Sequence, residues 1–160
     1  MVLMKTTLPK IDQTRNQLPS LMSGLETSLF QTTMPIRWSD VDADGRVNNV
    51  QFLRFVEEAR MQWASSLKLE KTAPGLAPVV AALDCTFHTA MRYPSMVHAE
   101  IFCTRLGRTS LTLRCELSTQ CQISGQEIAA ATSNFVWVWT DLSTGSSVPL
   151  PHVLREYCEA

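Results

Sequence analysis

Three carboxylates alternate along one short polar run of this chain, at Asp40, Asp42 and Asp44. Before the run, apolar residues alternate over 30–38 and predict a strand; after it, apolar residues at helical spacing over 49–67 predict a long helix. The run is therefore a turn that holds acids beside a helix start, where the helix dipole and free backbone N–H groups stabilise an ionised carboxylate and an oxyanion. A carboxylate next to such donors is a minimal apparatus for hydrolysing an activated acyl bond.

The segment that begins at Asp42 reads Asp-Ala-Asp-Gly-Arg-Val-Asn-Asn, and it is followed by Phe52-Leu-Arg-Phe and Glu57-Glu-Ala-Arg60. These residues resemble the signature of hotdog-fold thioesterases of the 4-hydroxybenzoyl-CoA thioesterase type. The resemblance is strongest over residues 36–60 and continues more loosely to about residue 140. It implies a hotdog fold and the hydrolysis of an acyl- or aroyl-CoA to the free acid and CoA.

The resemblance assigns roles to two residues of the run. It places the catalytic carboxylate, acting as nucleophile or general base, on Asp42. It places the backbone amide that polarises the thioester carbonyl on Asn49. The residues alone allow a second interpretation, in which Asp40, Asp42 and Asp44 only form the turn. We keep that interpretation for Asp40 and Asp44 and assign Asp42 to the chemistry.

Three further residues of the run are expected beside the substrate: Gly45, Val47 and Asn48. Gly45 supplies the backbone freedom that a tight turn into the helix requires. Asn48, with Gln51 three residues later, fits a capping box, so a helix cap competes with substrate contact at this position. Arg46 departs from the family pattern, where His is common; this leaves the reaction class standing and affects substrate contacts.

Arginines are candidates for binding the phosphates of a carrier such as coenzyme A, because the guanidinium fork matches such anions. We single out Arg92 and Arg108. Arg108 lies in Leu106-Gly-Arg-Thr-Ser110, a predicted hairpin turn that matches a recurrent hairpin of the family. Ordinary surface solvation is the competing explanation for each arginine.

The sequence lacks the residues that other enzyme classes would use for this or a related reaction. His88, His98 and His152 show no paired spacing, so no metal site is predicted and structural or solvent-exposed roles are expected. No Gly-x-Ser-x-Gly run is present for a serine hydrolase. A hydratase of the same fold is disfavoured, because the position five residues after Asp42 holds Val47 where such enzymes have His. No cofactor is predicted.

The remaining pattern is one helix followed by strands at about 78–88, 97–103, 111–118 and 127–140. Helices do not alternate with these strands, which argues against a parallel doubly wound sheet. The pattern predicts an α+β domain in which an antiparallel sheet of about five strands wraps one long central helix. This is the layout that the resemblance to the hotdog fold implies. Apolar residues on both faces of the last strand predict a central strand covered on both sides. On the first strand, we expect one face to carry Phe30, Thr32, Met34, Ile36 and Trp38.

Length and composition fit one domain, residues 30–160, behind an N-terminal extension, residues 1–29. The resemblance implies that this domain is a hotdog thioesterase domain. A net charge of −1 does not favour nucleic acid or an acidic membrane surface as a partner. No apolar run approaches the ~20 residues of a membrane-spanning helix. Five cysteines without a Cys-x-x-Cys pair fit a reducing compartment, so a cytoplasmic protein is expected, while an organelle-targeting leader within 1–29 stays open.

The expected partner is an acyl-CoA or another acyl thioester, with acyl carrier protein as the alternative carrier. In the family that the chain resembles, two units pair edge to edge and the active sites lie at the subunit boundary, so a homodimer or homotetramer is expected. A non-catalytic acyl-thioester-binding module is the rival from another class. Against its DNA-binding form, the extension is too short and too weakly basic for a helix-turn-helix. The acyl group and the pathway stay open.

Overall fold

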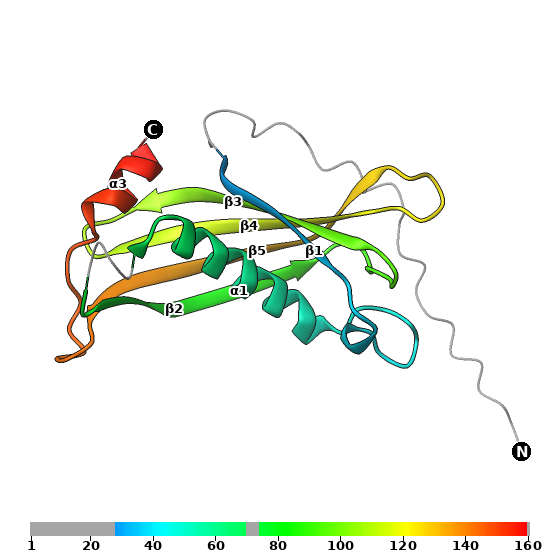
Figure 1. Ribbon diagram of the computed structural model, residues 1–160, viewed down its shortest axis with the longest axis horizontal. Coiled ribbons are helices and arrows are strands. Elements are labelled where there is room, and N and C mark those ends of the chain that lie inside the picture. Colours follow the sequence, from blue (N-terminus) through cyan, green and yellow to red (C-terminus); the bar gives the residue numbers. More distant parts are fainter. Residues whose placement is uncertain (1–27, 70–73, 160) are drawn as a thin grey trace, which may run out of the picture.

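The structure is a computed structural model, and it describes residues 28–69 and 74–159. Within these residues, eight elements follow one another (Figure 1): β1 (Ser28–Pro35), η3 (Trp38–Asp40), α1 (Asn49–Ser66), β2 (Leu76–Phe87), β3 (Met96–Leu106), β4 (Ser110–Gln120), β5 (Glu127–Asp141) and α3 (His152–Glu159). The predicted long helix and the four later strands are confirmed within a few residues. The extension predicted for 1–29 lies, except for its last two residues, outside the described residues.

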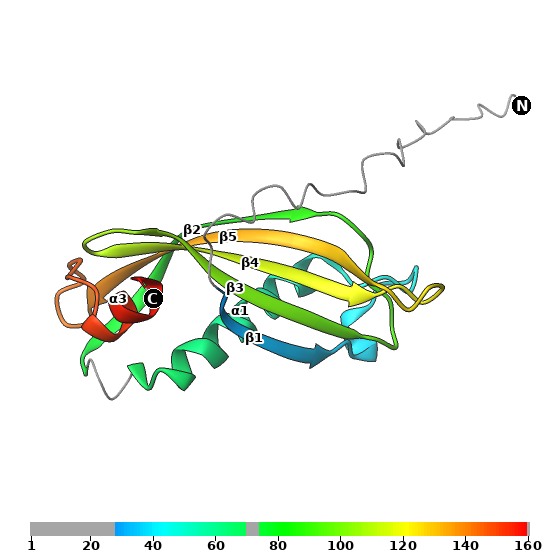
Figure 2. The same cartoon turned by 90° about the horizontal axis from the view of Figure 1, so that it is seen from above.

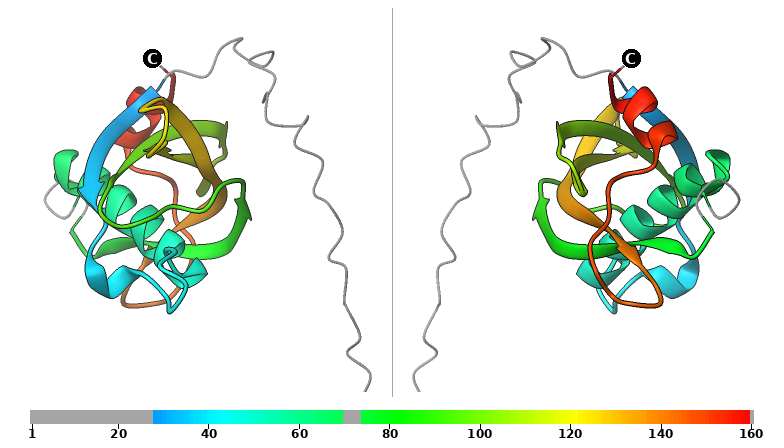
Figure 3. Two further views of the ribbon diagram at one scale, coloured as in Figure 1. Left: turned by 90° about the vertical axis from the view of Figure 1, so that its right-hand side faces the viewer. Right: turned by 90° about the vertical axis from the view of Figure 1, so that its left-hand side faces the viewer.

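The five strands form one antiparallel sheet in the order β1-β3-β4-β5-β2. Seen from above, β1 and β2 lie at opposite edges of this sheet (Figure 2). Seen end-on, the sheet bends around α1, which lies against its inner face (Figure 3). The predicted α+β hotdog architecture, one long helix wrapped by an antiparallel sheet, is therefore confirmed.

The core lies between α1 and the inner face of the sheet. Alternate residues of β4 and β5 point inward, as the period of two along a strand requires. Trp63 of α1 stacks on Trp137 of β5, with ring centroids 5.9 Å apart. The prediction that β5 is covered on both faces holds only for the inner face, because Val136 and Val138 on the other face are half-buried. The fully enclosed large side chains include Phe55, Trp63, Leu111, Leu113, Leu117, Phe135, Trp137 and Trp139.

The first strand ends earlier than its alternation predicts. Met34 and Ile36 are buried as expected, but Trp38 is 75% exposed. The strand ends at Pro35, and the Arg37 amide then donates to the Asp40 carboxylate at 2.7 Å, which turns the chain into the short helix η3. The prediction that the strand runs to residue 38, with Trp38 on the same face as Met34 and Ile36, is therefore wrong, because the bond between the Arg37 amide and Asp40 turns the chain before it reaches that residue.

β2 is one edge of the sheet, and it presents apolar side chains to solvent. Val79, Val80, Leu83 and Phe87 are between 37% and 49% exposed. Its other side pairs with β5 along nearly its whole length. An edge strand with free backbone groups and apolar side chains is a surface on which a second sheet edge can pair. Among the described residues no helix is both long and apolar enough to cross a membrane.

Candidate active site

The polar run between η3 and α1 folds into a miniature hairpin. The Asp42 amide donates to the Arg46 carbonyl at 2.8 Å, the Gly45 amide donates to the Asp42 carbonyl at 3.0 Å, and Val41 pairs with Val47. Gly45 has φ +70°, in the left-handed region that favours glycine, and a β-carbon there would meet no atom within 4 Å. The tight turn predicted at Gly45 is therefore present, and backbone conformation, not crowding, is what favours glycine there.

The three acids of the run have different environments. Asp40 is buried, and its Oδ2 accepts from the Arg37 amide and from Arg54 Nη2, 3.1 Å away. Its carbonyl also accepts from the Asn48 amide at 2.9 Å, which ties η3 to the start of α1. Asp44 is exposed and forms an ion pair with Arg46 at 3.0 Å. Asp40 is thus a structural residue and Asp44 a surface one.

Asp42 has one carboxylate oxygen engaged and one available. Its Oδ1 accepts from the Asp44 amide at 2.9 Å and from the Arg46 amide at 3.1 Å, so two backbone bonds fix the orientation of the group. Its Oδ2 has no hydrogen-bond or ion-pair partner within the described part of the chain. A carboxylate held in this way can use its second oxygen as a nucleophile or as a base toward water.

The first turn of α1 presents backbone donors. Asn48 caps the helix, with its side-chain oxygen accepting from the Val50 amide at 3.1 Å. The second half of the predicted capping box is wrong, since Gln51 Oε1 accepts from Arg54 Nε at 2.7 Å instead of bonding Asn48. The Asn49 amide donates to no acceptor among residues 28–69 and 74–159. Such an unpaired N–H at a helix start is suited to bind an oxyanion.

Asp42 and Asn49 meet at one pocket of about 210 Å³. Phe52 of α1 and Phe87 of β2 form an edge-to-face pair at this pocket, with centroids 5.1 Å apart. Of the residues predicted beside the substrate, Val47 lines the pocket, whereas Gly45 and Asn48 lie in the chain next to it. The full lining is Asp42, Arg46, Val47, Asn49, Phe52, Phe87, His88, Thr89 and Ala90.

Residues 87–90 form a wall of the pocket that the sequence did not predict. They are the last residue of β2 and the three residues after it, some forty residues beyond the acidic run, and only the pairing of strands brings them to that run. His88 is held in place by its amide, which donates to the Ala130 carbonyl at 2.8 Å, and by its Nε2, which lies 2.9 Å from the Thr132 hydroxyl. The structural role expected for His88 agrees with these bonds.

Arg92 and Arg108 lie in different parts of the molecule. Arg92 pairs with Arg46 through the backbone, next to the Met91 carbonyl that accepts from the Val47 amide at 2.9 Å. Arg92 is therefore close to the pocket wall. Arg108 lies beyond the far end of β3, whose eleven residues span about 35 Å. Within one chain the structure does not bring Arg108 to the pocket.

Charged residues further along α1 are paired. Glu58 bonds Arg54 at 3.0 Å, and Glu57 lies 3.7 Å from Arg60. Burial lowers the pKa of Arg60, whose guanidinium lies over the ring of Trp137 at 5.5 Å. In the described ranges, no three His, Cys, Asp or Glu side chains gather in a way that could hold a metal ion. Among the residues that line the pocket, Asp42 Oδ2 and the Asn49 N–H have no partner within the described part of the chain.

The sequence of this chain matches the profile of the thioesterase-like superfamily over residues 36–157. That range contains the acidic run, the helix start and every residue that lines the pocket. The chain belongs to the thioesterase-like superfamily. For a member of this superfamily the reaction class is thioester hydrolysis. Comparison with curated proteins finds no match.

Solved structures share the fold of this thioesterase-like chain. The PA2801 protein from Pseudomonas aeruginosa is 28% identical, with a TM-score of 0.74 over 81% of this chain and 98% of its own. Slr0204, a 1,4-dihydroxy-2-naphthoyl-CoA thioesterase from Synechocystis, is 20% identical, with a TM-score of 0.65 over 81% and 94%. The DHNA-CoA thioesterase from Staphylococcus aureus is 18% identical, with a TM-score of 0.66 over 81% and 86%.

Proposed function

We propose that this protein hydrolyses an acyl- or aroyl-CoA to the free acid and CoA, with Asp42 as its catalytic carboxylate. One observation carries the proposal: the available Oδ2 of Asp42 and the unpaired N–H of Asn49 belong to the same pocket. A thioester hydrolase needs a group that attacks or activates water, and a donor where negative charge develops. These two groups supply both functions without any further residue.

The reaction proceeds with the thioester carbonyl oxygen directed at the Asn49 N–H. As a nucleophile, Asp42 Oδ2 forms a bond to the carbonyl carbon, the C–S bond breaks, and water then hydrolyses the resulting mixed anhydride. As a base, Oδ2 takes a proton from water while the water oxygen attacks, and that proton returns to the departing thiolate. In both routes the carbonyl oxygen becomes negative and the backbone N–H stabilises it.

Coenzyme A is the carrier that the surroundings of the pocket support. Arg92 lies beside the pocket wall and has no acidic partner in the described part of the chain, so its guanidinium can bind phosphate. Two structural neighbours are named as thioesterases of an aroyl-CoA. Acyl carrier protein is the alternative carrier, and it shares the phosphopantetheine arm but lacks the nucleotide.

The proposed assembly is a homodimer at minimum, formed through β2. This edge strand exposes Val79, Val80, Leu83 and Phe87, and Phe87 also belongs to the pocket. A partner that pairs with β2 would cover these side chains and narrow the pocket. Light scattering at assay concentration measures the oligomeric state directly, and a fully active monomer would contradict this part of the proposal.

The experiment that tests the proposed function is a panel of acyl thioesters assayed for release of free thiol. The panel should contain aliphatic and aromatic acyl groups, each carried by CoA, by pantetheine and by acyl carrier protein. Turnover that is fastest with CoA esters supports the proposal. Hydrolysis of the acyl-carrier-protein esters alone would show that acyl carrier protein, and not CoA, is the carrier. Binding of thioesters without release of thiol would make the protein a non-catalytic acyl-thioester-binding module and contradict the proposal.

A further inference from the structure

Two large aromatic side chains lie together on the surface, close to the pocket. Trp38 and Tyr93 form an edge-to-face pair with ring centroids 6.0 Å apart, and they are 75% and 45% exposed. The other three tryptophans of the chain, at 63, 137 and 139, are at most 1% exposed. Trp38 is therefore an exception in a protein that otherwise places its tryptophans in the core.

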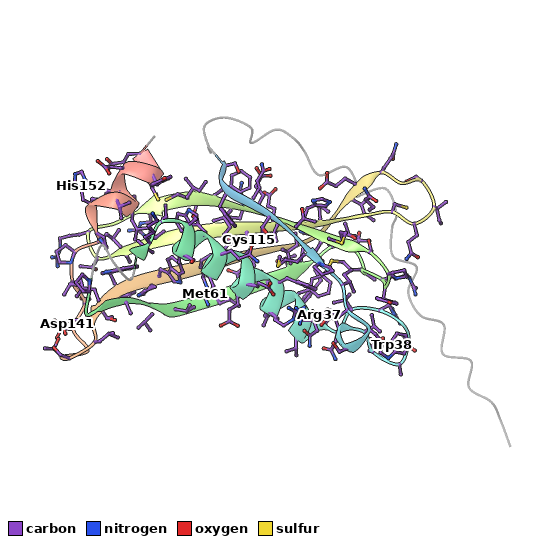
Figure 4. All side chains as sticks on the ribbon, viewed as in Figure 1. Arg37, Trp38, Met61, Cys115, Asp141 and His152 are labelled. Carbon is purple, nitrogen blue, oxygen red and sulfur yellow. The ribbon has the colours of Figure 1, made fainter. Side chains whose placement is uncertain are left out.

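Both rings belong to segments that are hydrogen-bonded to the pocket loop. Trp38 begins η3, whose last residue Asp40 accepts from the Asn48 amide at the start of α1. The Met91 carbonyl accepts from the Val47 amide. Tyr93 is two residues after Met91, so at most about 7 Å of chain separates Tyr93 from this bond. Figure 4 shows Arg37 and Trp38 together at the end of the molecule where α1 begins.

Each of the two rings is preceded in the chain by an arginine. Arg37 stands before Trp38, and Arg92 stands before Tyr93. Both arginines are exposed, and neither is within ion-pair distance of an acidic side chain in residues 28–69 and 74–159. An exposed aromatic face stacks on a nucleobase, and a free guanidinium binds phosphate through paired donors. The combination is chemically matched to a nucleotide.

We propose that Trp38, Tyr93, Arg37 and Arg92 bind the nucleotide end of coenzyme A. The adenine stacks on the exposed face of Trp38, which Tyr93 supports edge-on, and the two arginines bind the phosphates. The flexible pantetheine arm then reaches from this surface to the pocket, where the thioester meets Asp42. The choice of carrier rests on the proposed function, whereas binding of the nucleotide itself requires no hydrolysis.

Trp38 supplies its own binding assay, because it is the one tryptophan of the four that solvent reaches. The probe is adenosine 3′,5′-bisphosphate, titrated into the full chain while tryptophan fluorescence and its quenching by acrylamide are followed. Stacking on Trp38 should change the fluorescence saturably and reduce acrylamide quenching. In Trp38→Phe the probe should cause no change in fluorescence, because the three remaining tryptophans are buried. A wild-type signal that does not saturate, or that persists in Trp38→Phe, overturns the proposal.

The kinetic test compares two carriers in matched variants. Trp38→Ala should raise KM for an acyl-CoA about tenfold, the order expected for one base stacked on an aromatic ring, with kcat unchanged. It should leave KM for the matched acyl-pantetheine unchanged, because that substrate has no nucleotide. Trp38→Phe keeps a stacking face and should retain most of the affinity. Tyr157→Ala, a change of a half-exposed aromatic residue on α3 far from the pocket, is the control and should alter neither KM.

Three results would overturn the inference. One is an unchanged KM for the acyl-CoA in Trp38→Ala. Another is an equal rise for both carriers, which would indicate damage to the loop. The third is a change in the oligomeric state of Trp38→Ala by light scattering, which would make the aromatic pair a subunit contact. Absence of turnover on every thioester would defeat the proposed function, and the fluorescence titration would still decide whether the nucleotide site exists.

Discussion

The two ends of this molecule both present arginine and backbone groups, but they differ in whether the backbone groups are already hydrogen-bonded. At the pocket end, Asp42 Oδ2, the Asn49 amide and the Arg92 guanidinium have no partner in the described part of the chain. At the hairpin end, the Arg108 carbonyl accepts from the Leu150 amide and from Arg155 Nη2, each at 3.0 Å. Figure 4 places these ends at opposite sides, with Trp38 at one and His152 at the other.

This difference helps to distinguish a ligand-binding site from a contact that only stabilises the fold. Arg155 Nη2 also bonds the Gly107 carbonyl at 2.7 Å, so α3 holds the β3–β4 hairpin through a charged donor. The backbone carbonyls of the hairpin are therefore bonded within the chain itself, whereas the Arg108 guanidinium, like that of Arg92, has no hydrogen-bond or ion-pair partner in the described part of the chain. Polar groups that remain unpaired at a pocket are the ones available to a substrate. The predictions below test this difference, from the largest expected effect to the smallest.

After loss of the Asp42 carboxylate, the largest effect on kcat is expected from loss of the Asn49 amide. Asn49 is the first residue of α1, where proline is well accommodated, and Asn48 before it has φ −63° and ψ 141°, the extended conformation that a following proline requires. Asn49→Pro therefore removes the N–H and should leave the helix intact. The loss of one oxyanion donor should lower kcat by about 10²–10³. Asn49→Ala, which keeps the N–H, should stay near the wild-type kcat; an equal loss in both variants would assign the role to the side chain.

The next effect is on stability and separates Asp40 from the catalytic acid. Asp40→Asn removes a buried charge that accepts from the Arg37 amide and from Arg54 Nη2. The free energy of unfolding, measured by urea denaturation, should fall by about 1–3 kcal/mol, as expected when buried charged hydrogen bonds are weakened. The kcat of the folded fraction should change much less than that of an Asp42 variant. If Asp40→Asn had a normal free energy of unfolding and a collapsed kcat, Asp40 would be the catalytic acid in place of Asp42.

A smaller effect compares arginines from the two ends. Arg92→Ala should raise KM for an acyl-CoA several-fold, with kcat nearly unchanged, because phosphate binding is shared by the ground and transition states. The matched acyl-pantetheine should show no such rise. Arg155→Met should lower the melting temperature and leave both KM values unchanged. Equal hydrolysis of CoA and pantetheine esters by the wild type would remove phosphate binding by Arg92 and leave the reaction class standing.

The smallest effect is in thiol chemistry. Cys121, in the loop after β4, has its pKa lowered by hydrogen bonds from Ser124, whereas burial raises the pKa of Cys115 to about 12. On α3, contact with Cys103 and burial raise the pKa of Cys158. Because the thiolate is the reactive form, alkylation at pH 8 should modify Cys121 first and Cys115 last, with Cys158 also slow. Peptide mass spectrometry after short exposures measures the order; early labelling of Cys158 would contradict it.

The sequence predicted those parts of the site that are contiguous in the chain. Asp42, Val47 and Asn49 lie within one turn and one helix start, so local spacing and the family resemblance were enough to bring them together. Phe87 and Ala90 could not be predicted in this way, because the pairing of β2 with β5 and the path of the chain into β3 bring them to the pocket.

Other features could not be predicted from the sequence, for local or for long-range reasons. Trp38 continues the alternation of residues 30–36 in the sequence, but the bond between the Arg37 amide and Asp40 ends that alternation, and no periodicity shows this bond. Arg92 and Arg108 are equally plausible phosphate ligands as residues. Only the length of β3 separates them, placing one beside the pocket and the other at the far end. The fold was thus predictable from periodicity together with the family resemblance, whereas the proximity of residues within the site depended on strand pairing.

The most direct test of the central claim is kcat for Asp42→Asn on one accepted thioester, beside Asp44→Asn. Asparagine keeps the oxygen that accepts from the Asp44 and Arg46 amides, so the turn should persist, and circular dichroism would verify the fold. It provides neither a carboxylate nucleophile nor a base, so kcat should fall by about 10²–10⁴, while Asp44→Asn should stay near wild type. A folded Asp42→Asn protein with near-wild-type kcat would contradict the assignment of Asp42 as the catalytic carboxylate.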